Sequence, residues 1–380
     1  METGRSRVSA IARHLQAATT SIDRDNTSSC DVPVVVGAMV ADIQSFPSTQ
    51  LSRGTTVVGQ VKYSHGGVGR NVAECMAKLG VPSFLISVVG DDIAGNALVD
   101  HWKSLGLTTN GIRRCCGAAT PVISIAFDTT GEVAAGVADT GTVEKHLTPD
   151  WISQFSTIIQ AAPVVLLDAN LTPESLETAC KLAKQAEVPV WFEPVSVSKS
   201  VRAAGLYKYL AYVSPNEKEL AAMGESLSSL DTAPVPSGWS KEQRYIHLLL
   251  QAGVKHVIVT LGSKGSLACT LESASGSSFS IRCLRVPATA ARVASLSGAG
   301  DCLVAGCIAW LATRGDGDVL GCVAHGTAVA KQAVESRLNV PDVISQQDLW
   351  SDGDAARSMA RELSLDGGIF VEHMPGDRRP

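Results

Sequence analysis

The sequence has few charged and few aromatic residues and no long hydrophobic segment. Its 380 residues carry a formal net charge of -5, with 18% charged and 5% aromatic side chains. A protein dedicated to nucleic acid normally has a basic face, so this charge argues against such a partner. The most apolar segment, 302–312, has 11 residues, whereas a membrane-spanning helix needs about 20. We therefore expect neither a nucleic-acid nor a membrane partner.

The ten cysteines lack the spacing of a metal site. None belongs to a Cys-x-x-Cys pair and no histidine cluster accompanies them, so a zinc site has little support. A disulfide framework is typical of short secreted chains and not of a chain of this length. We expect reduced thiols, several of which fall in apolar helical patterns, where a thiol packs as a small hydrophobic group.

Alternating apolar patterns indicate a sheet covered by helices. The β-branched run at 32–36 is typical of a buried parallel strand. Between about residues 148 and 260, strand and helix patterns alternate. This order predicts an α/β fold with a doubly wound, mostly parallel sheet of about nine strands and helices on both faces. Further strand patterns near 40–66 and 110–140 break the alternation and predict a small β-sheet lid over one edge.

Composition divides the chain into three parts. We expect a polar N-terminal segment at 1–30, a folded domain at 31–345 and a polar, ragged tail at 346–380. Within the domain, the polar stretches 225–240 and 272–278 read as surface loops.

The N-terminal segment contains a possible targeting motif. Arg7 and Val8 are separated by five residues from His14 and Leu15, which resembles the type 2 peroxisomal targeting nonapeptide. Its apolar residues would share one face of a helix, as a receptor groove requires. A frayed basic terminus or an ordinary transit peptide would have a similar composition. We expect a peroxisomal location, with the cytoplasm as the alternative.

The segment Ser-Gly-Ala-Gly-Asp at 297–301 carries the strongest chemical signal. Gly298 and Gly300 flank Ala299, and glycines let backbone N–H groups converge without interference from a Cβ atom. An apolar helix begins there, and its N-terminal dipole favours an anion at the same point. Asp301 would face a bound hydroxyl group and accept its proton. Alternatively, Asp301 only caps the helix and the glycines form a tight turn.

Two motifs together resemble the signatures of the PfkB family of ribokinase-like carbohydrate and nucleoside kinases. Gly-Ala-Gly-Asp before a long apolar helix is similar to the C-terminal signature, and Gly-Gly-Val-Gly-Arg-Asn at 66–71 is similar to the other one. The resemblance extends in the same order from about residue 34 to about residue 340. It implies a ribokinase-like fold and phosphoryl transfer from ATP, with Asp301 as the base and residues 298–300 as the anion hole.

The resemblance also implies where the sugar binds. Asp42 would hold the ribose diol, because one carboxylate can accept hydrogen bonds from two neighbouring hydroxyls. Gly66 and Gly67 would let the backbone approach the sugar, and Asn71 would supply a donor and an acceptor. Asn170, at a strand end, matches a sugar-contacting position more weakly. Alternatively, Asp42 is a solvated turn residue and Asn71 a helix cap.

The nucleotide-binding residues are implied in the same way. Asn216 would face the ATP phosphates, and Glu219 would orient water around Mg²⁺, an ion that takes few protein ligands. Thr260, Gly262 and Gly265 resemble the family's nucleotide loop. The segment 216–219 would otherwise be a solvated, acidic helix start. Whether a monovalent cation lies beside the anion hole stays open.

One segment points to a particular substrate. Glu-Pro-Val-Ser-Val-Ser-Lys at 193–199 resembles the form found in pseudouridine kinases, whereas typical sugar kinases of the family carry an Asn- or Asp-containing variant. Lys199 would contact a base carbonyl or the transferred phosphate, or would be a surface lysine. The resemblance implies phosphorylation of the 5′-hydroxyl of pseudouridine.

Two kinds of alternative function and one assembly follow from the same residues. Adenosine, ribose or fructose could be the substrate, or the chain could be a catalytically silent binding subunit with a kinase fold. Strand edges exposed on a small sheet are commonly covered by a partner, so we expect a homodimer through the lid.

Overall fold

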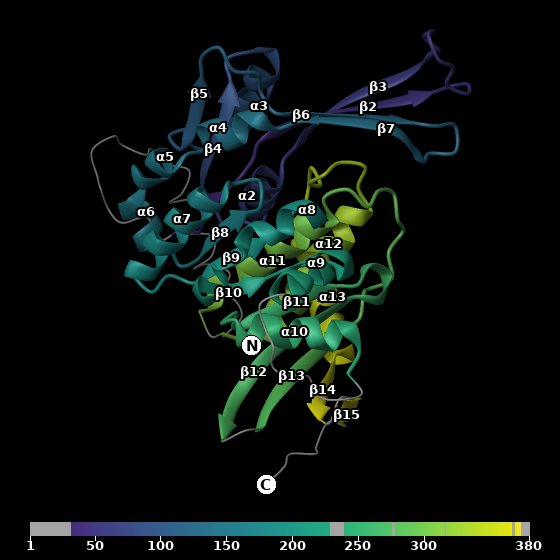
Figure 1. The fold of residues 1–380 in the computed structure, drawn as a ribbon. Coiled ribbons are helices and arrows are strands. Elements are labelled where there is room, and N and C mark those ends of the chain that lie inside the picture. Colours follow the sequence, from purple (N-terminus) through teal and green to yellow (C-terminus); the bar gives the residue numbers. More distant parts are fainter. Residues whose placement is uncertain (1–31, 229–238, 276–277, 316, 367–368, 374–380) are drawn as a thin grey trace, which may run out of the picture. The chain divides into compact units, whose positions relative to one another are not determined.

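The computed structural model describes residues 32–228, 239–275, 278–315, 317–366 and 369–373 (Figure 1). The targeting motif at 7–15 lies outside these residues, as does most of the expected loop at 225–240. Among the described helices, none is both long enough and apolar enough to cross a membrane.

A large sheet forms the centre of the fold. It has eleven strands in the order β15-β14-β13-β12-β11-β10-β9-β8-β1-β4-β5. The strands are β1 (Val34–Val36), β4 (Phe84–Gly90), β5 (Ile112–Cys115), β8 (Val165–Asp168), β9 (Val190–Glu193), β10 (Leu210–Val213), β11 (His256–Thr260), β12 (Ser266–Ser275), β13 (Ser278–Val286), β14 (Arg361–Asp366) and β15 (Ile369–His373). The part from β11 to β5 is parallel, and β12 to β15 continue it as antiparallel strands.

Helices cover both faces of this sheet, as the sequence predicts. Val34 and Val36 belong to one hydrophobic core and Val35 to the other, because successive side chains of a strand point to opposite faces. The first core includes residues of α4 (Gly141–His146), α5 (Pro149–Ser153), α6 (Ser156–Ala161), α7 (Pro173–Gln185), α9 (Glu217–Ser228) and α10 (Lys241–Gln251). The second includes residues of α2 (Val68–Lys78), α3 (Ile93–Ser104), α11 (Ala299–Arg314), α12 (Val319–Val334) and α13 (Gln346–Met359).

A small sheet has four strands in the order β3-β2-β6-β7 (Figure 1). They are β2 (Val40–Pro47), β3 (Gly59–Gly66), β6 (Val122–Phe127) and β7 (Val133–Asp139). This sheet corresponds to the expected lid, with one correction. The first strand of the predicted segment 110–140, β5, pairs with β4 in the large sheet, because its buried Ile112 and Cys115 belong to the cores of that sheet.

Two polar segments that were expected to lack regular structure contain helix or strand. The expected tail at 346–380 contains helix α13 and strands β14 and β15, which also bring the strand count to eleven. Helix α13 buries only Leu349 and Ala356, so its composition is that of a surface segment. The expected loop at 272–278 is largely strand, because β12 runs to Ser275 and β13 begins at Ser278.

The start of α2 lies against the ends of β1 and β8. Gly37 follows β1, and a Cβ atom on Gly69 would lie 2.7 Å from the Cα atom of Gly37. Asp168 ends β8 and is fully buried. Its Oδ2 accepts hydrogen bonds from the backbone N–H groups of Ala38 (2.8 Å) and Gly69 (3.0 Å), and its Oδ1 accepts one from Asn170 (2.9 Å). These contacts hold the first turn of α2 over the carboxyl ends of the strands.

We expect Gly69→Ala to lower the free energy of unfolding by about 1 to 3 kcal/mol, since the added methyl group would press backbone against backbone. Urea denaturation measures this. Gly141→Ala is the matched control, because Gly141 has no neighbour within 4 Å of its Cβ position. Equal stability of the two variants would contradict the close approach of α2 and β1.

Candidate active site

Asp301 lies in the first turn of helix α11, beside open space. No side chain caps this helix, and its N-cap residue, Gly298, has a left-handed backbone with φ 77°. A side chain on Gly298 would collide with the carbonyl oxygen of Asn339. At Gly300, in contrast, no atom lies within 4 Å of the Cβ position. The Ala299 N–H donates to the carbonyl oxygen of Leu296 (3.4 Å), and the Cys302 N–H donates to that of Gly298 (2.9 Å). The N–H groups of Gly300 and Asp301 between them have no carbonyl partner within the helix, so they are available to an anion.

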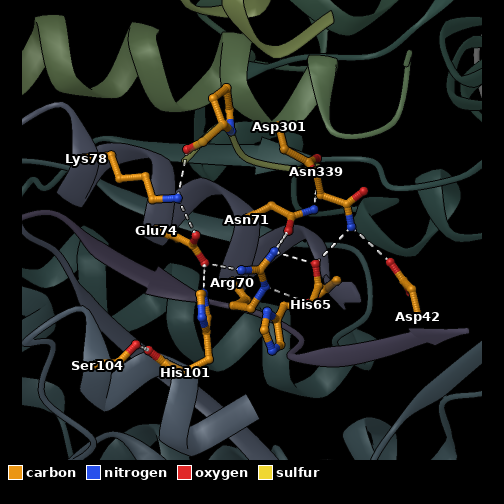
Figure 2. Close-up of polar contacts among 12 residues, drawn as sticks. Asp42, His65, Arg70, Asn71, Glu74, Lys78, His101, Ser104, Asp301 and Asn339 are labelled. Atoms are coloured by element: carbon orange, nitrogen blue, oxygen red, sulfur yellow. Dashed lines mark hydrogen bonds and ion pairs between the residues drawn. The ribbon is translucent and has the colours of Figure 1, made fainter. Parts of the chain in front are cut away.

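Asp301 is held from α2 by Asn71. The Asn71 Nδ2 atom donates a hydrogen bond of 2.6 Å to Asp301 Oδ2, as Figure 2 shows. Desolvation raises the pKa of Asp301 to about 6, although this hydrogen bond and the charge of Arg70 lower it. A carboxylate with a pKa near neutrality is suited to accept a proton. The structure thus brings together the two residues that the signatures assigned separately to the base and the sugar.

Asp42 enters the same network from the small sheet. Asn339 Nδ2 donates to Asp42 Oδ2 (3.0 Å) and to the carbonyl oxygen of His65 (2.9 Å) (Figure 2). A Cβ atom on Gly66 would collide with Asp42 Oδ2, so a larger residue there would displace this carboxylate. Gly67 has φ 92° at the start of α2. Burial raises the pKa of Asp42.

Asn170 and Lys199 form a second pair near the start of α2. Lys199 Nζ donates a hydrogen bond of 2.6 Å to Asn170 Oδ1. Burial lowers the pKa of Lys199, whereas the charge of Asp168 raises it. Lys199 follows Val195, a non-glycine residue with φ 65°, which is an unusual conformation that often marks functional loops. The lysine is half-buried and paired, so it differs from an ordinary surface lysine.

The residues expected to bind nucleotide form a separate group at the ends of β10 and β11. The Asn216 backbone N–H donates to Glu219 Oε2 (2.9 Å), and Asn216 Oδ1 accepts from the Glu219 backbone N–H (3.0 Å). This reciprocal pair starts α9. Thr260 forms a parallel bridge with Asn216. The turn after it has left-handed backbone at Gly262 (φ 58°) and Gly265 (φ 87°).

Glu193 connects the two groups electrostatically. It is buried, and Ser214 Oγ donates a short hydrogen bond to it. Trp191 Nε1 in turn donates a hydrogen bond of 2.7 Å to Ser214 Oγ. Desolvation raises the pKa of Glu193 well above its usual value, and the charges of Asp301 and Glu219 raise it further. The ionisation of Glu193 is therefore coupled to the charge of Asp301, the candidate base, and to the charge of Glu219 in the second group.

Three of these residues were not assigned a role from the sequence. Arg70 and Glu193 fall inside the motifs, but neither motif distinguishes a buried polar residue from an exposed one. Asn339 lies in no motif, and only its approach to Asp42 in the folded chain reveals it. The one signal available in advance was an arginine directly before the motif asparagine.

The site fits a metal that arrives with nucleotide better than a resident metal centre. The described residues contain no group of three or more His, Cys, Asp or Glu side chains placed to hold a metal ion. Mg²⁺ usually keeps several waters and binds through one or two carboxylates together with substrate phosphates. Glu219 supplies one such carboxylate at the start of α9, and the start of α11 suits phosphate oxygens.

Comparisons with known proteins agree on one family. The model described as "pfkB family carbohydrate kinase" matches residues 33–342. A pseudouridine kinase of Arabidopsis thaliana is 40% identical over 377 residues, covering 88% of this chain and 98% of that protein. A pseudouridine kinase of Escherichia coli (strain K12) is 27% identical over 277 residues, covering 73% of this chain and 82% of that protein.

Solved structures agree on the fold. Arabidopsis thaliana ribokinase, complexed with ribose and ATP, has a TM-score of 0.70 at 21% identity, over 85% of this chain and 99% of that one. Thermotoga maritima ribokinase has a TM-score of 0.68 at 23% identity, with the same coverage. Since the family model spans most of the chain, including both signature motifs, the chain belongs to the PfkB family of carbohydrate kinases.

Proposed function

We propose that this kinase transfers the γ-phosphoryl group of ATP to the 5′-hydroxyl of pseudouridine, giving pseudouridine 5′-phosphate. The observation that carries the chemistry is the Asp301 carboxylate, held by Asn71 beside the open start of α11. The substrate is supported by the resemblance to two proteins named pseudouridine kinase and by the segment at 193–199.

The nucleoside would lie between the small sheet and the start of α2. In this arrangement Asp42 accepts hydrogen bonds from the ribose diol, and the backbone at Gly66 and Gly67 approaches the sugar. Asn71 donates a hydrogen bond to Asp301, the proposed catalytic base. Asn170 and Lys199 then contact the nucleoside from the end of β8 and the turn after β9.

Phosphoryl transfer would follow with Asp301 as proton acceptor. Asp301 takes the proton of the 5′-hydroxyl, the oxygen bonds to the γ-phosphorus, and the bond to the ADP oxygen breaks. The amides of Gly298, Ala299 and Gly300 stabilise the charge that develops on the transferred group. When bound, Mg²⁺ neutralises phosphate charge, and Glu219 orients its water. Asn216, Thr260, Gly262 and Gly265 hold the nucleotide; a monovalent cation beside the anion hole belongs to this proposal as well.

Location and assembly are proposals on separate evidence. The motif at 7–15 would direct the chain to the peroxisome, which a reporter fused to residues 1–30 measures directly.

A homodimer would form through the small sheet. Its face opposite Asp42 presents Tyr63 and Val137, which are 78% and 72% exposed, on either side of the paired Ile43 and Ser124. Sedimentation of Tyr63→Asp against wild type tests this assembly.

The substrate is tested by a panel of acceptors with ATP. We expect kcat/KM for pseudouridine to exceed that for uridine, adenosine, ribose and fructose by at least about tenfold, since buried polar groups reject ligands that leave them unpaired. Preferred turnover of ribose would overturn the proposed substrate while leaving the family unchanged. Absence of turnover with every acceptor would instead indicate a silent binding subunit.

The base is tested by Asp301→Asn. We expect turnover to fall by about 10²- to 10⁴-fold, the range lost with a general base, while ATP binding measured by calorimetry stays near that of wild type. Asp318→Asn is the matched control, because Asp318 caps α12 through the N–H of Gly321 (3.0 Å). If the two variants had similar turnover, Asp301 would be only a structural residue.

A further inference from the structure

Arg70 is a buried cation that makes contacts in several directions from the first turns of α2. It is 2% exposed. Its Nε atom donates to the carbonyl oxygen of Gly66 (3.0 Å), and one terminal nitrogen donates to the carbonyl oxygen of His65 (2.7 Å). The same nitrogen donates a short hydrogen bond to Asn71 Oδ1 (Figure 2). Arg70 thus ties the end of β3 to the side chain that holds Asp301.

Glu74, one turn further along α2, forms an ion pair with the Arg70 guanidinium. It is 3% exposed and pairs with Arg70, with Lys78 Nζ (2.9 Å) and with His101 Nε2 (2.9 Å). Burial alone would raise the pKa of Glu74, but the hydrogen bond from His101 and the charges of Arg70 and Lys78 lower it to about 2. Glu74 is therefore an anion at any working pH. A buried ion pair of this kind is costly unless its geometry is well satisfied, so its position beside the site calls for an explanation.

The contact between Arg70 and Asn71 determines which way the amide faces. An asparagine side chain has an acceptor oxygen and a donor nitrogen at similar positions, and its orientation follows from its partners. Arg70 has only donors, so it requires the Asn71 oxygen, and the Nδ2 atom is left for Asp301 (2.6 Å). With the amide reversed, two donors would meet at Arg70 and two acceptors at Asp301.

We propose that Arg70 is a positioning residue for the kinase reaction: it fixes the Asn71 amide toward Asp301 and joins this pair to the small-sheet strand that carries His65 and Gly66. The inference rests on the proposed function, because it takes Asp301 as the base. Arg70 acts through Asn71 and touches no reacting atom.

The charge of Arg70 has a second consequence at Asp301. Carboxyl groups face Asp301 from three strands: Asp42 from β2, Asp168 from β8 and Glu193 from β9. The charges of Asp42 and Asp168 raise the pKa of Asp301, whereas the charge of Arg70 lowers it. The base is ionised, and so active, above its pKa. Removing the Arg70 charge would raise that pKa and move the loss of activity to higher pH.

The pH dependence of kcat/KM for Arg70→Gln and Arg70→Lys tests the proposal. For Arg70→Gln we expect the acidic limb to move up by about one pH unit, the lower end of the shift caused by a nearby opposite charge. The plateau above it should fall at least about tenfold, because the base is misplaced. Arg70→Lys keeps the charge but lacks the planar fork, so its limb should stay near the wild-type position while its plateau falls.

Arg357→Gln is the matched control. It removes an arginine paired with an aspartate, Asp318, at 2.7 Å, and should leave both limb and plateau unchanged. Thermal melting shows whether each variant is folded. If Arg70→Gln does not fold, the double variant Arg70→Met/Glu74→Gln removes the ion pair as a whole, and the same upward shift of the limb is expected.

Two results would overturn the proposal. One is a folded Arg70→Gln, or a folded double variant, with the limb and plateau of wild type. The other is a plateau loss that comes with no shift of the limb in Arg70→Gln, which would indicate a structural role only. Asp301→Asn, assayed in parallel, separates this inference from the proposed function: if Asp301→Asn is inactive and Arg70→Gln is unchanged, only the role of Arg70 is wrong.

Discussion

The buried carboxylate of Asp168 fixes the geometry on which the site depends. It accepts hydrogen bonds from the backbone of Ala38, Gly69 and Asn170, and so it joins the exit of β1, the first turn of α2 and the end of its own strand. Because buried N–H groups need partners, these segments are held together as one unit. Asn71 follows within the first turn of α2, which explains how it reaches Asp301, a residue 230 positions away in the chain.

Four buried or partly buried acidic side chains surround the candidate site, and burial disfavours their ionised form. Desolvation raises the pKa values of Asp42, Asp168, Glu193 and Asp301, and for Glu193 and Asp301 nearby acidic groups add to this effect. The positive counterweights are Arg70 and the dipole at the open start of α11. Under the proposed function, ATP and Mg²⁺ would enter this site together, as is common in phosphoryl transfer.

The sequence was informative where a short motif carries its own backbone requirement. Gly298 and Gly67 have a positive φ, a local requirement that a glycine in the sequence indicates without knowledge of the neighbouring segments. Asn339 and Arg70 acquire their roles only from contacts between distant segments, which no local pattern records. The C-terminal strands were missed for a related reason, since β14 is held by pairing with β13 and β15 by pairing with β14. Helix α13 was missed because only Leu349 and Ala356 of its residues are buried.

The two hairpins of the small sheet enter the chain at separate places, β2–β3 between β1 and α2, and β6–β7 between β5 and α4. The first hairpin ends beside the candidate site, since the carbonyl oxygen of Gly66 accepts a hydrogen bond from Arg70. The two hairpins are joined where the Ala41 N–H donates to the carbonyl oxygen of Pro121, directly before β6. Under the proposed function, an acceptor would therefore be held by two insertions of the chain, whereas Asp301 and the expected nucleotide-binding residues belong to the large sheet and its helices.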